Sequence, residues 1–143
     1  MVLVDFFDKA EDHLLKFAVI IAKKDNQWVL CKHRDRDTLE VPGGHREIGE
    51  EILATARREL YEETGAVEYK IEPICVYRVL RQEEDQGSFG MLYYAECYKF
   101  DPLPDLEIEK VIFMDDLPNN WTYPDIQPRL LERFIQYINN CSV

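Results

Sequence analysis

Acidic residues crowd the end of a predicted central helix. The segment 51–64 has a helical hydrophobic period, and Gly65 after it is a typical stop. Three of its residues, Glu59, Glu62 and Glu63, stand at the i, i+3 and i+4 spacing at which like charges oppose helix formation by roughly 0.2–0.5 kcal/mol per pair. They also lie near the helix C-terminus, where the macrodipole disfavours negative charge. A chain that keeps this arrangement must fold so that something else stabilises the carboxylates.

Helix geometry places these carboxylates on one side of the helix, at the rim of the core. Each residue turns by about 100°, so Glu59 and Glu63 project about 40° apart, and Glu62 lies about 60° from Glu59. The apolar stripe beside them consists of Leu53, Ala56 and Leu60. Crowded, partly desolvated carboxylates resist ionisation, and a hard divalent cation such as Mg²⁺ removes that penalty. A solvated acidic helix face is the alternative, and these residues alone leave both interpretations open.

The residues before the helix favour the metal site. A glycine-rich loop, "VPGGHREIGEE" (41–51), leads into the helix, and its glycines allow close backbone approach. From Gly44 to Ala66 the sequence reads G-x5-E-x7-R-E-L-x-E-E-x-G-A, which resembles the box of the Nudix hydrolase family, G-x5-E-x7-R-E-U-x-E-E-x-G-U with U aliphatic. The last position departs from the pattern, because Ala66 is small. This departure affects packing, and Val67 next to it can supply the bulk.

The resemblance implies a metal-dependent hydrolase, with Mg²⁺ as the cofactor and Mn²⁺ as a substitute. Matched by position, the metal ligands would be Gly44 through its carbonyl, Glu59, Glu62 and Glu63. Arg58 matches the arginine that pairs with acidic residues of the box and fixes the loop, and Glu50 matches one of those acids. A plain salt bridge is the alternative for this arginine. The catalytic group implied by the resemblance is therefore Glu62, Glu63, Arg58 and Glu50.

The family reaction is hydrolysis of a nucleoside diphosphate linked to another moiety. A water, deprotonated by a metal or by a glutamate, attacks one phosphorus in line. The general base is a glutamate of the box or an acid on a distant loop. Candidates outside the box are Glu83, Glu84, Asp85, Glu107 and Glu109. The more ordinary explanation for each of these is a solvated loop acid.

The choice of substrate is less constrained than the reaction. The short chain resembles small mutator-type (MutT-like) members, which convert a nucleoside triphosphate to the monophosphate and pyrophosphate. Its layout is also similar to that of bacterial antimutator pyrophosphohydrolases that act on oxidised purines such as 8-oxo-dGTP. Alternatives are a hydrolase of nucleotide sugars or dinucleoside polyphosphates, and a nucleotide sensor without turnover. The sensor is disfavoured because no carboxylate of the box is missing.

Candidates for substrate binding follow from position and side-chain chemistry. Asn119 and Asn120 lie about where mutator-type proteins place a base-reading asparagine, although Asn after Pro is also ordinary turn chemistry. Trp121 and Tyr123 could stack on a base or could plug the edge of the core. His45 follows the glycines and could approach a phosphate.

Strand-like runs surround the central helix. Segments 15–24 and 27–34 are expected to form a hairpin, with a turn at "DN". Further strands are expected at 39–41, 67–80, 89–100 and 109–116, and an amphipathic helix at 126–138. We therefore predict an α/β sandwich with a mixed sheet between helices. This order of elements also looks like the Nudix fold, as a single domain over residues 1–143 with the box at 44–66.

The acidic balance limits the partners. With 17 basic and 28 acidic residues, the net charge of −11 argues against binding nucleic acid or an anionic membrane. A small-molecule nucleotide remains suitable because divalent cations can bridge two negative partners, and a monomer and a homodimer both stay open. The N-terminus is unlike a signal peptide, and no run approaches the roughly 18 apolar residues of a membrane span. Cys31, Cys75 and Cys97 lie in strand-like runs that suit buried free thiols, so we expect a cytoplasmic protein.

Overall fold

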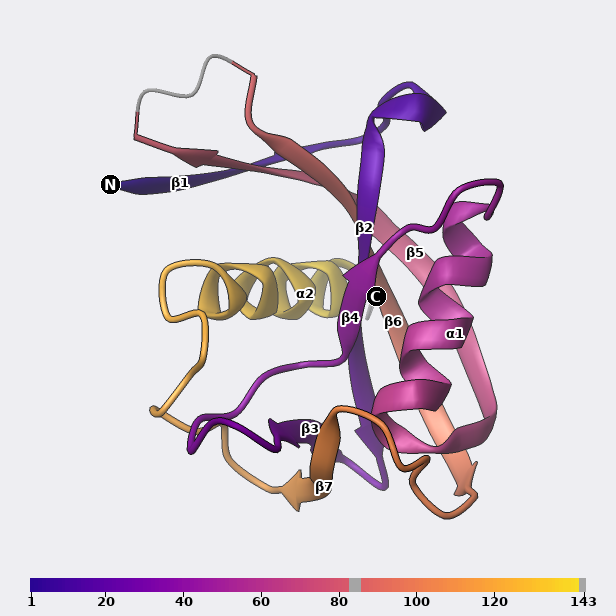
Figure 1. Cartoon of the computed structure of the whole chain (residues 1–143). Coiled ribbons are helices and arrows are strands. Elements are labelled where there is room, and N and C mark those ends of the chain that lie inside the picture. Colours follow the sequence, from indigo (N-terminus) through magenta and orange to yellow (C-terminus); the bar gives the residue numbers. More distant parts are fainter. Residues whose placement is uncertain (83–85, 142–143) are drawn as a thin grey trace.

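The computed structural model describes residues 1–82 and 86–141, and this part of the chain forms a seven-stranded mixed sheet with two α-helices against it (Figure 1). The strands are β1 (Val2–Phe7), β2 (Leu15–Lys24), β3 (Gln27–His33), β4 (Gly43–His45), β5 (Ala66–Arg81), β6 (Ser88–Phe100) and β7 (Ile108–Met114). The helices are α1 (Ile52–Thr64) and α2 (Gln127–Cys141), and a short 3-10 turn (Asp12–Leu14) precedes β2. The predicted fold class is confirmed.

One parallel pairing makes the sheet mixed. β2 runs parallel to β6, and the other pairings in the order β1-β5-β6-β2-β3-β7 are antiparallel. The predicted hairpin joins β2 to β3 through Asp25 and Asn26, whose φ angles of 49° and 68° suit a tight two-residue turn. β1 was not expected from the sequence, and it pairs with β5 along its whole length.

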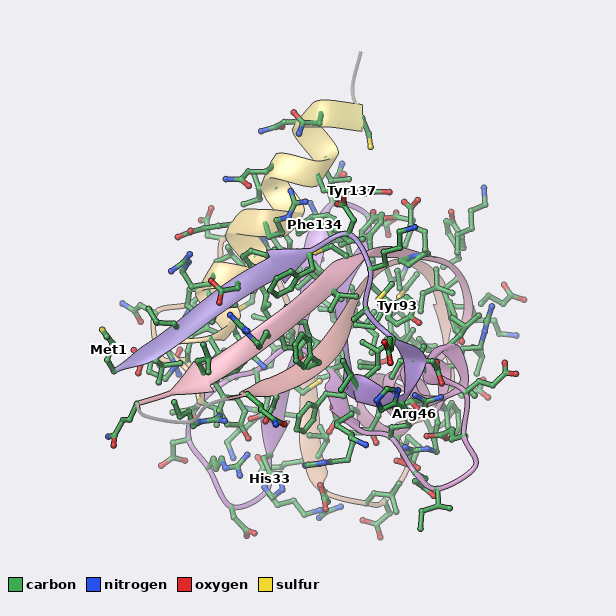
Figure 2. The ribbon with its side chains drawn as sticks, turned by 90° about the horizontal axis from the view of Figure 1, so that it is seen from above. Met1, His33, Arg46, Tyr93, Phe134 and Tyr137 are labelled. Atoms are coloured by element: carbon green, nitrogen blue, oxygen red, sulfur yellow. The ribbon has the colours of Figure 1, made fainter. Side chains whose placement is uncertain are left out.

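Alternate residues of the strands serve the two helices, as the two-residue period of a strand requires. The face toward α1 carries mainly small residues of β2 and β6, which let the helix approach closely: Ala18, Ile20, Ala22 and Ala95. The opposite face packs on α2 through Ile21 and Leu92, against Leu130, Leu131 and Phe134. Figure 2 shows Phe134 between α2 and the strands, where its ring centroid lies 4.8 Å from that of Tyr94. In the described chain neither helix is long and apolar enough to cross a membrane.

The buried face of α1 differs from the predicted stripe at one position. Ala56 and Leu60 are fully buried, but Leu53 is exposed. Thr55 is buried in its place. Burial of this polar residue is tolerated because its hydroxyl donates to Glu50 Oε1 at 2.6 Å. The helix is therefore turned slightly from the expected orientation and anchors the loop before it.

The largest departure from the predicted elements lies before α1. The sequence predicts a short strand at 39–41, but Leu39 and Glu40 make only isolated bridges, and the strand is β4. β3 pairs with the last two residues of β2, so β4 can occupy the rest of that β2 edge. A Cβ on Gly43 would lie 2.6 Å from the carbonyl oxygen of Ala18, so this close approach requires glycine. The glycine loop thus becomes part of the sheet, beside α1.

The cysteines carry free thiols, as predicted. Cys31, Cys75 and Cys97 are buried and Cys141 is exposed, and none of them is in a disulfide. The Cys31 thiol donates to the Glu63 carbonyl at 3.3 Å, which ties β3 to the end of α1.

Candidate active site

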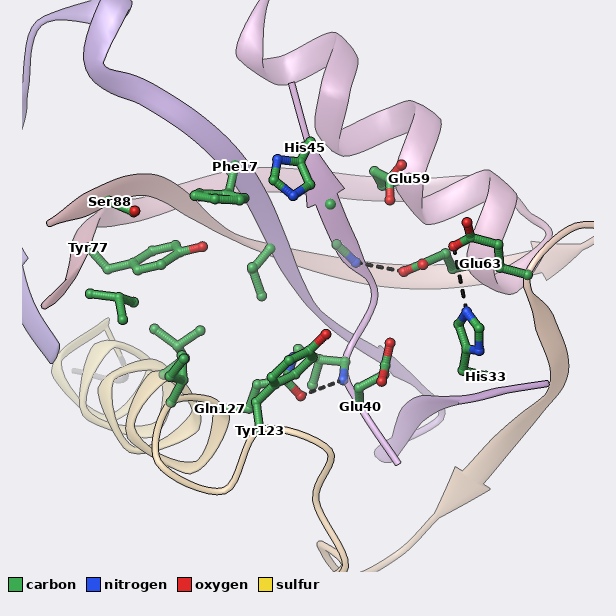
Figure 3. A pocket seen from close by; sticks show the side chains of 18 of the residues that line it. Phe17, His33, Glu40, His45, Glu59, Glu63, Tyr77, Ser88, Tyr123 and Gln127 are labelled. Carbon is green, nitrogen blue, oxygen red and sulfur yellow. Dashed lines mark hydrogen bonds and ion pairs between the residues drawn. The ribbon is translucent and has the colours of Figure 1, made fainter. Parts of the chain in front are cut away.

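A cleft of about 710 Å³ opens beside β4 and is lined by both helices and by β2, β4 and β5 (Figure 3). One part of the wall is acidic and includes Glu40, Glu59, Glu63 and Glu107. Another part is largely apolar and consists of Phe17, Val19, Tyr77, Val79 and Leu130. Figure 3 shows Tyr77 and Glu63 at opposite sides of this space. One cavity therefore joins two carboxylates of the box, Glu59 and Glu63, to a surface suited to an aromatic ring.

Glu63 is held by the glycine loop. Its Oε1 accepts a hydrogen bond from the Gly43 N–H at 2.8 Å. Burial raises the pKa of Glu63 to about 8, the Gly43 N–H opposes this rise, and the charges of Glu59 and Glu40 add to it. Without a compensating cation, the carboxyl therefore holds a proton over much of the neutral range.

Glu59 lies against the backbone of Gly44. A Cβ on Gly44 would lie 2.5 Å from the carboxylate carbon of Glu59, so a larger residue here would push the Glu59 carboxylate from this position. Burial raises the pKa of Glu59 to about 7, while Arg58 lowers it and Glu62 raises it. The glycine and the glutamate predicted as metal ligands are thus neighbours, although 15 positions separate them in the chain.

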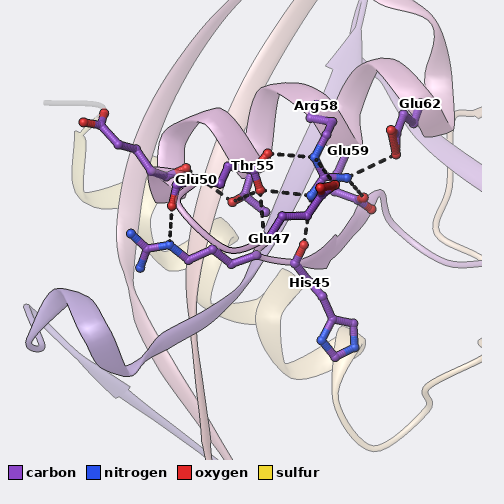
Figure 4. A network of polar contacts seen from close by, with 9 residues as sticks. His45, Glu47, Glu50, Thr55, Arg58, Glu59 and Glu62 are labelled. Atoms are coloured by element: carbon purple, nitrogen blue, oxygen red, sulfur yellow. Dashed lines mark hydrogen bonds and ion pairs between the residues drawn. The ribbon is translucent and has the colours of Figure 1, made fainter.

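Arg58 joins three carboxylates of the box, those of Glu50, Glu59 and Glu62, into one network (Figure 4). Its Nε and Nη2 donate to the two oxygens of Glu50 at 2.7 and 3.0 Å, and its Nη1 donates to Glu59 and Glu62 at 2.7 and 3.2 Å. Nη2 also donates to the His45 carbonyl at 2.9 Å. The hydrogen bond from Arg58 lowers the pKa of Glu50 to about 2, so this carboxylate is ionised at neutral pH. This geometry supports an orienting role for the arginine.

Arg46 fixes the same loop from the other side and was missed in the sequence. Its Nε donates to the Glu50 carbonyl at 2.6 Å. Its Nη1 donates to the carbonyls of Asp12 and Leu15 at 2.8 and 3.2 Å, and its Nη2 pairs with the Asp12 carboxylate at 2.9 Å. It occupies a variable position of the box pattern, so the motif gave no signal for it. The loop between β4 and α1 is therefore held by two arginines.

The acidic part of the cleft fits a hard divalent cation in its chemistry. Carboxylate and carbonyl oxygens are the donors that Mg²⁺ prefers, and burial raises the pKa of both Glu59 and Glu63, an effect that a bound cation would oppose. Among the described residues, no three Asp, Glu, His or Cys side chains already form a metal cage. Glu59 and Glu62 instead face Arg58, and Glu63 faces Gly43. Binding of a cation would therefore require some of these carboxylates to exchange partners.

Glu40 is an acid of the cleft that sequence reasoning missed. Only 7% of it is exposed, and its Oε2 lies 3.3 Å from Nη1 of Arg36. Arg36 in turn lies over the ring of Tyr123, 5.9 Å from the centroid. An acid inside the apolar triplet "LEV" was the available signal, but strand alternation would have placed it toward solvent.

The predicted substrate-binding residues do not all lie in the cleft. His45 lines the cleft, and its ring packs on Phe17 with centroids 4.5 Å apart. Asn119 and Asn120 are exposed and do not belong to the cleft wall. The Asn120 amide instead donates to the Asp37 carbonyl at 3.3 Å, because their loop folds back onto the segment before β4. Base reading by these two asparagines stays a prediction, with no support from their position.

The two aromatic residues of this loop, Trp121 and Tyr123, lie in different environments. Tyr123 lines the cleft and remains available to a base. Trp121 packs against the core on the α2 side. Trp121 thus takes the role of a plug at the edge of the core, and stacking of Tyr123 on a base stays a prediction.

The candidate general bases outside the box differ in whether they line the cleft. Glu107 lines the cleft, and its Oε2 lies 3.8 Å from Nε2 of His33. Glu109 pairs with Lys32 at 3.1 Å and does not line the cleft. The remaining candidates lie outside the described residues: Glu83, Glu84 and Asp85.

Comparison with known proteins agrees with this geometry. A model of the NUDIX domain matches residues 12–133. The chain belongs to the NUDIX domain family. It is a Nudix pyrophosphohydrolase, a hydrolase that acts on acid anhydrides.

Individual relatives of this Nudix hydrolase differ in their named substrates. It is 30% identical over 118 residues to the protein named "Putative 8-oxo-dGTP diphosphatase YtkD" of Bacillus subtilis (strain 168). This match covers 82% of this chain and 73% of YtkD. It is similar to a mutant of the B. subtilis pyrophosphohydrolase BsRppH, with 26% identity, a TM-score of 0.78, and coverage of 94% of this chain and 90% of that one. The NUDIX domain of Shewanella oneidensis NrtR, complexed with ADP ribose, shares the fold with a TM-score of 0.63 at 18% identity, over 91% of this chain and 90% of that one.

Proposed function

We propose that this Nudix hydrolase converts a nucleoside triphosphate to the nucleoside monophosphate and pyrophosphate, with Mg²⁺ as its cofactor. The observation that carries the proposal is the continuity of the cleft, which joins Glu59 and Glu63 to an apolar wall. The acidic part suits phosphates that arrive with cations, and the apolar wall suits a base. A cavity of about 710 Å³ lies within the roughly 300–1,000 Å³ typical of small-molecule sites.

The residues of the box hold the metal and keep its ligands in place. The proposed ligands are Gly44 through its carbonyl, Glu59, Glu62 and Glu63. A bound Mg²⁺ would neutralise phosphate oxygens and make a water more acidic. Arg58 and Glu50 fix the loop that carries Gly44, through the hydrogen bonds described above. Positioning and charge neutralisation supply most of the catalysis in such reactions.

The chemical step is in-line displacement at one phosphorus. A bond forms between the water oxygen and that phosphorus, and the bond from phosphorus to the bridging oxygen breaks. Attack at the α phosphorus expels pyrophosphate, and attack at the β phosphorus expels the nucleoside monophosphate. Either leaving group takes the electron pair of the broken bond, and the proton of the water passes to a carboxylate. The cleft offers Glu63 within the box and Glu107 outside it for this last role.

We further propose an oxidised purine nucleotide, such as 8-oxo-dGTP, as the preferred substrate. The relationship to YtkD supports this choice, since it extends over most of both chains. The apolar and aromatic wall is compatible with a purine, whose flat face would lie against Tyr77 or Tyr123.

A panel of nucleotides assayed with Mg²⁺ tests the proposal. Wild type should release pyrophosphate from nucleoside triphosphates, and Glu63→Gln should lower turnover at least roughly a hundredfold, because a metal ligand or reacting group is lost. Equal rates in the two proteins would contradict the site. Turnover restricted to nucleotide sugars or dinucleoside polyphosphates would replace the substrate class, and nucleotide binding without any turnover would indicate a sensor.

We also propose that residues 1–143 act as one domain in the cytoplasm, as a monomer or a homodimer. The common sheet, which joins β1 to β5 and β3 to β7, supports the single domain. The free thiols of Cys31, Cys75 and Cys97 favour a reducing compartment. Light scattering on the purified protein would give the oligomeric state.

A further inference from the structure

The side chain of Gln127, at the start of α2, has a fixed orientation. The backbone N–H of Val41 donates to its amide oxygen at 2.9 Å. A backbone N–H can only donate, so the oxygen of the amide must face Val41 and the –NH₂ group must face away. Gln127 is only 7% exposed, and its hydrogen bond with Val41 is buried. Packing and one hydrogen bond thus settle which half of the amide is left for another partner.

The –NH₂ group of Gln127 has no acceptor among the described residues. Among the described residues, Arg78 Nε is the one fully buried side-chain nitrogen or oxygen that lacks a hydrogen-bond partner. The unpartnered amide nitrogen of Gln127 is therefore not fully buried and reaches open space. Gln127 lines the cleft, so the cleft is the open space that the amide nitrogen reaches. A buried amide that is held at its oxygen therefore offers hydrogen-bond donors to whatever fills the cleft.

The amide lies where the two parts of the cleft meet. Tyr123, Ile126 and Leu130, from the same segment of chain, continue the apolar wall beside it. Glu40, next in sequence to Val41, belongs to the acidic part. Figure 3 shows Gln127 and Tyr123 next to Glu40, on the same side of the cavity. A base lying on the apolar wall, with its phosphates toward the carboxylates, would present a polar edge to this amide.

We propose that Gln127 reads the base, by donating from its amide nitrogen to a carbonyl oxygen on the edge of a 6-oxopurine such as guanine or 8-oxoguanine. This inference rests on the proposed function, because it assumes a nucleotide in the cleft. An adenine places an amino group where guanine has its carbonyl, so two donors would face each other. A site built to hydrogen-bond one group rejects an analogue that leaves its buried polar atoms unpaired. Gln127 is therefore a specificity-determining residue.

The substitution Gln127→Glu separates recognition from structure. A glutamate keeps the shape and can still accept from the Val41 N–H, but it replaces the donor that faces the cleft by a second acceptor. The added charge will weaken binding of every nucleotide, so the informative quantity is a ratio. We expect the ratio of kcat/KM for dGTP to that for dATP to fall at least about tenfold, which corresponds to roughly 1.4 kcal/mol.

Binding of the products gives a readout that does not depend on turnover. Calorimetric titration with dGMP and dAMP should show a wild-type preference for dGMP that shrinks in Gln127→Glu and in Gln127→Met. Thermal unfolding of both variants reports the loss of the Val41 contact, which only Gln127→Met removes. Asn120→Asp tests the competing assignment of base reading to the asparagine loop.

Three results would overturn the inference. One is an equal loss for both bases in Gln127→Glu and Gln127→Met, which would make Gln127 a purely structural link. Another is a change of the base ratio in Asn120→Asp without one at Gln127, and the third is a wild-type preference for adenine. Absence of triphosphate hydrolysis by wild type would contradict the proposed function instead, and dGMP and dAMP binding would still decide the role of Gln127.

Discussion

Gly44 lies so close to Glu59 that a Cβ on the glycine would be 2.5 Å from the carboxylate carbon. A side chain at this position would disturb the Glu59 carboxylate without straining the backbone, since the positive-φ glycines of the described chain are Gly49, Gly65 and Gly87. Loop and helix are matched in shape at the point where the metal is proposed to bind.

Gly44→Ala should displace the Glu59 carboxylate and lower kcat/KM at least roughly tenfold, because misplacement of a catalytic group by about 1 Å is costly. Gly49 provides the matched variant: its φ is 78° and open space surrounds it. Gly49→Ala should lower the free energy of unfolding by about 1 kcal/mol through backbone strain while kcat/KM changes little. Steady-state kinetics and denaturant unfolding of both proteins distinguish the two effects. Unchanged kinetics in Gly44→Ala would show that the site tolerates a shifted Glu59.

Metal-free protein should lose stability as the pH rises from about 4.5 to about 8. The folded-state pKa values of Glu59 and Glu63, about 7 and about 8, lie above the ordinary 4.5 of glutamate. The folded state therefore binds more protons than the unfolded state in this window, and deprotonation favours unfolding. Thermal unfolding in the presence of a chelator should give a lower Tm near pH 8 than near pH 5.5.

Two further measurements assign this pH effect to the site. Glu63→Gln should flatten the decline in Tm, whereas Glu68→Gln, which removes an exposed carboxylate of β5, should leave it as in wild type. Added Mg²⁺ should raise the Tm of wild type near pH 8 and do so less in Glu63→Gln, since a ligand that binds the folded state stabilises it. A pH slope that survives in Glu63→Gln would contradict the assignment.

Arg58→Lys should lower kcat/KM by roughly 10–100-fold, because a lysine cannot make the fork of bonds that holds Glu50 and Glu59 together. It should also reduce the loss of stability on acidification. The pKa of Glu50, held at about 2 by Arg58, makes the wild type lose stability as the pH falls from about 4.5 to about 2. In Arg58→Lys the guanidinium is absent, so the pKa of Glu50 should return toward its ordinary value.

The neighbouring Arg57 offers a control for this change. Its Nη1 donates to the Tyr69 hydroxyl at 3.2 Å, away from the carboxylates of the box. Arg57→Lys should retain wild-type kinetics and the wild-type acid transition, followed by circular dichroism. Equal effects of the two substitutions would mean that Arg58 acts only through general helix stability.

Glu107→Gln should lower kcat by roughly 10–100-fold if Glu107 accepts the proton of the attacking water, as expected for loss of a general base. Glu109→Gln is the matched change two residues away, at a carboxylate that pairs with Lys32 outside the cleft. It should leave kcat near the wild-type value. A wild-type rate in Glu107→Gln would assign the proton to Glu63 or to another glutamate of the box.

The sequence predicted what depends on local geometry. Glu59, Glu62 and Glu63 were placed on one side of a helix because the turn per residue fixes that relation, and the hairpin at Asp25 and Asn26 followed from turn chemistry. Long strands were found because their hydrophobic runs have a strand period. The exposed position of Leu53 was not foreseen, since a helical period leaves the rotation of the helix against the sheet open by tens of degrees.

The identity of the chain as a Nudix hydrolase was already present in its sequence, because the box is a set of spacings along one loop and one helix. The remainder of the cleft was decided by tertiary structure. β4 forms where β2 has an unpaired edge, Glu40 turns into the cavity, and Gln127 meets Val41 across 86 positions of chain. Such contacts are set by how the sheet and α2 pack, and no periodicity along the sequence records that packing.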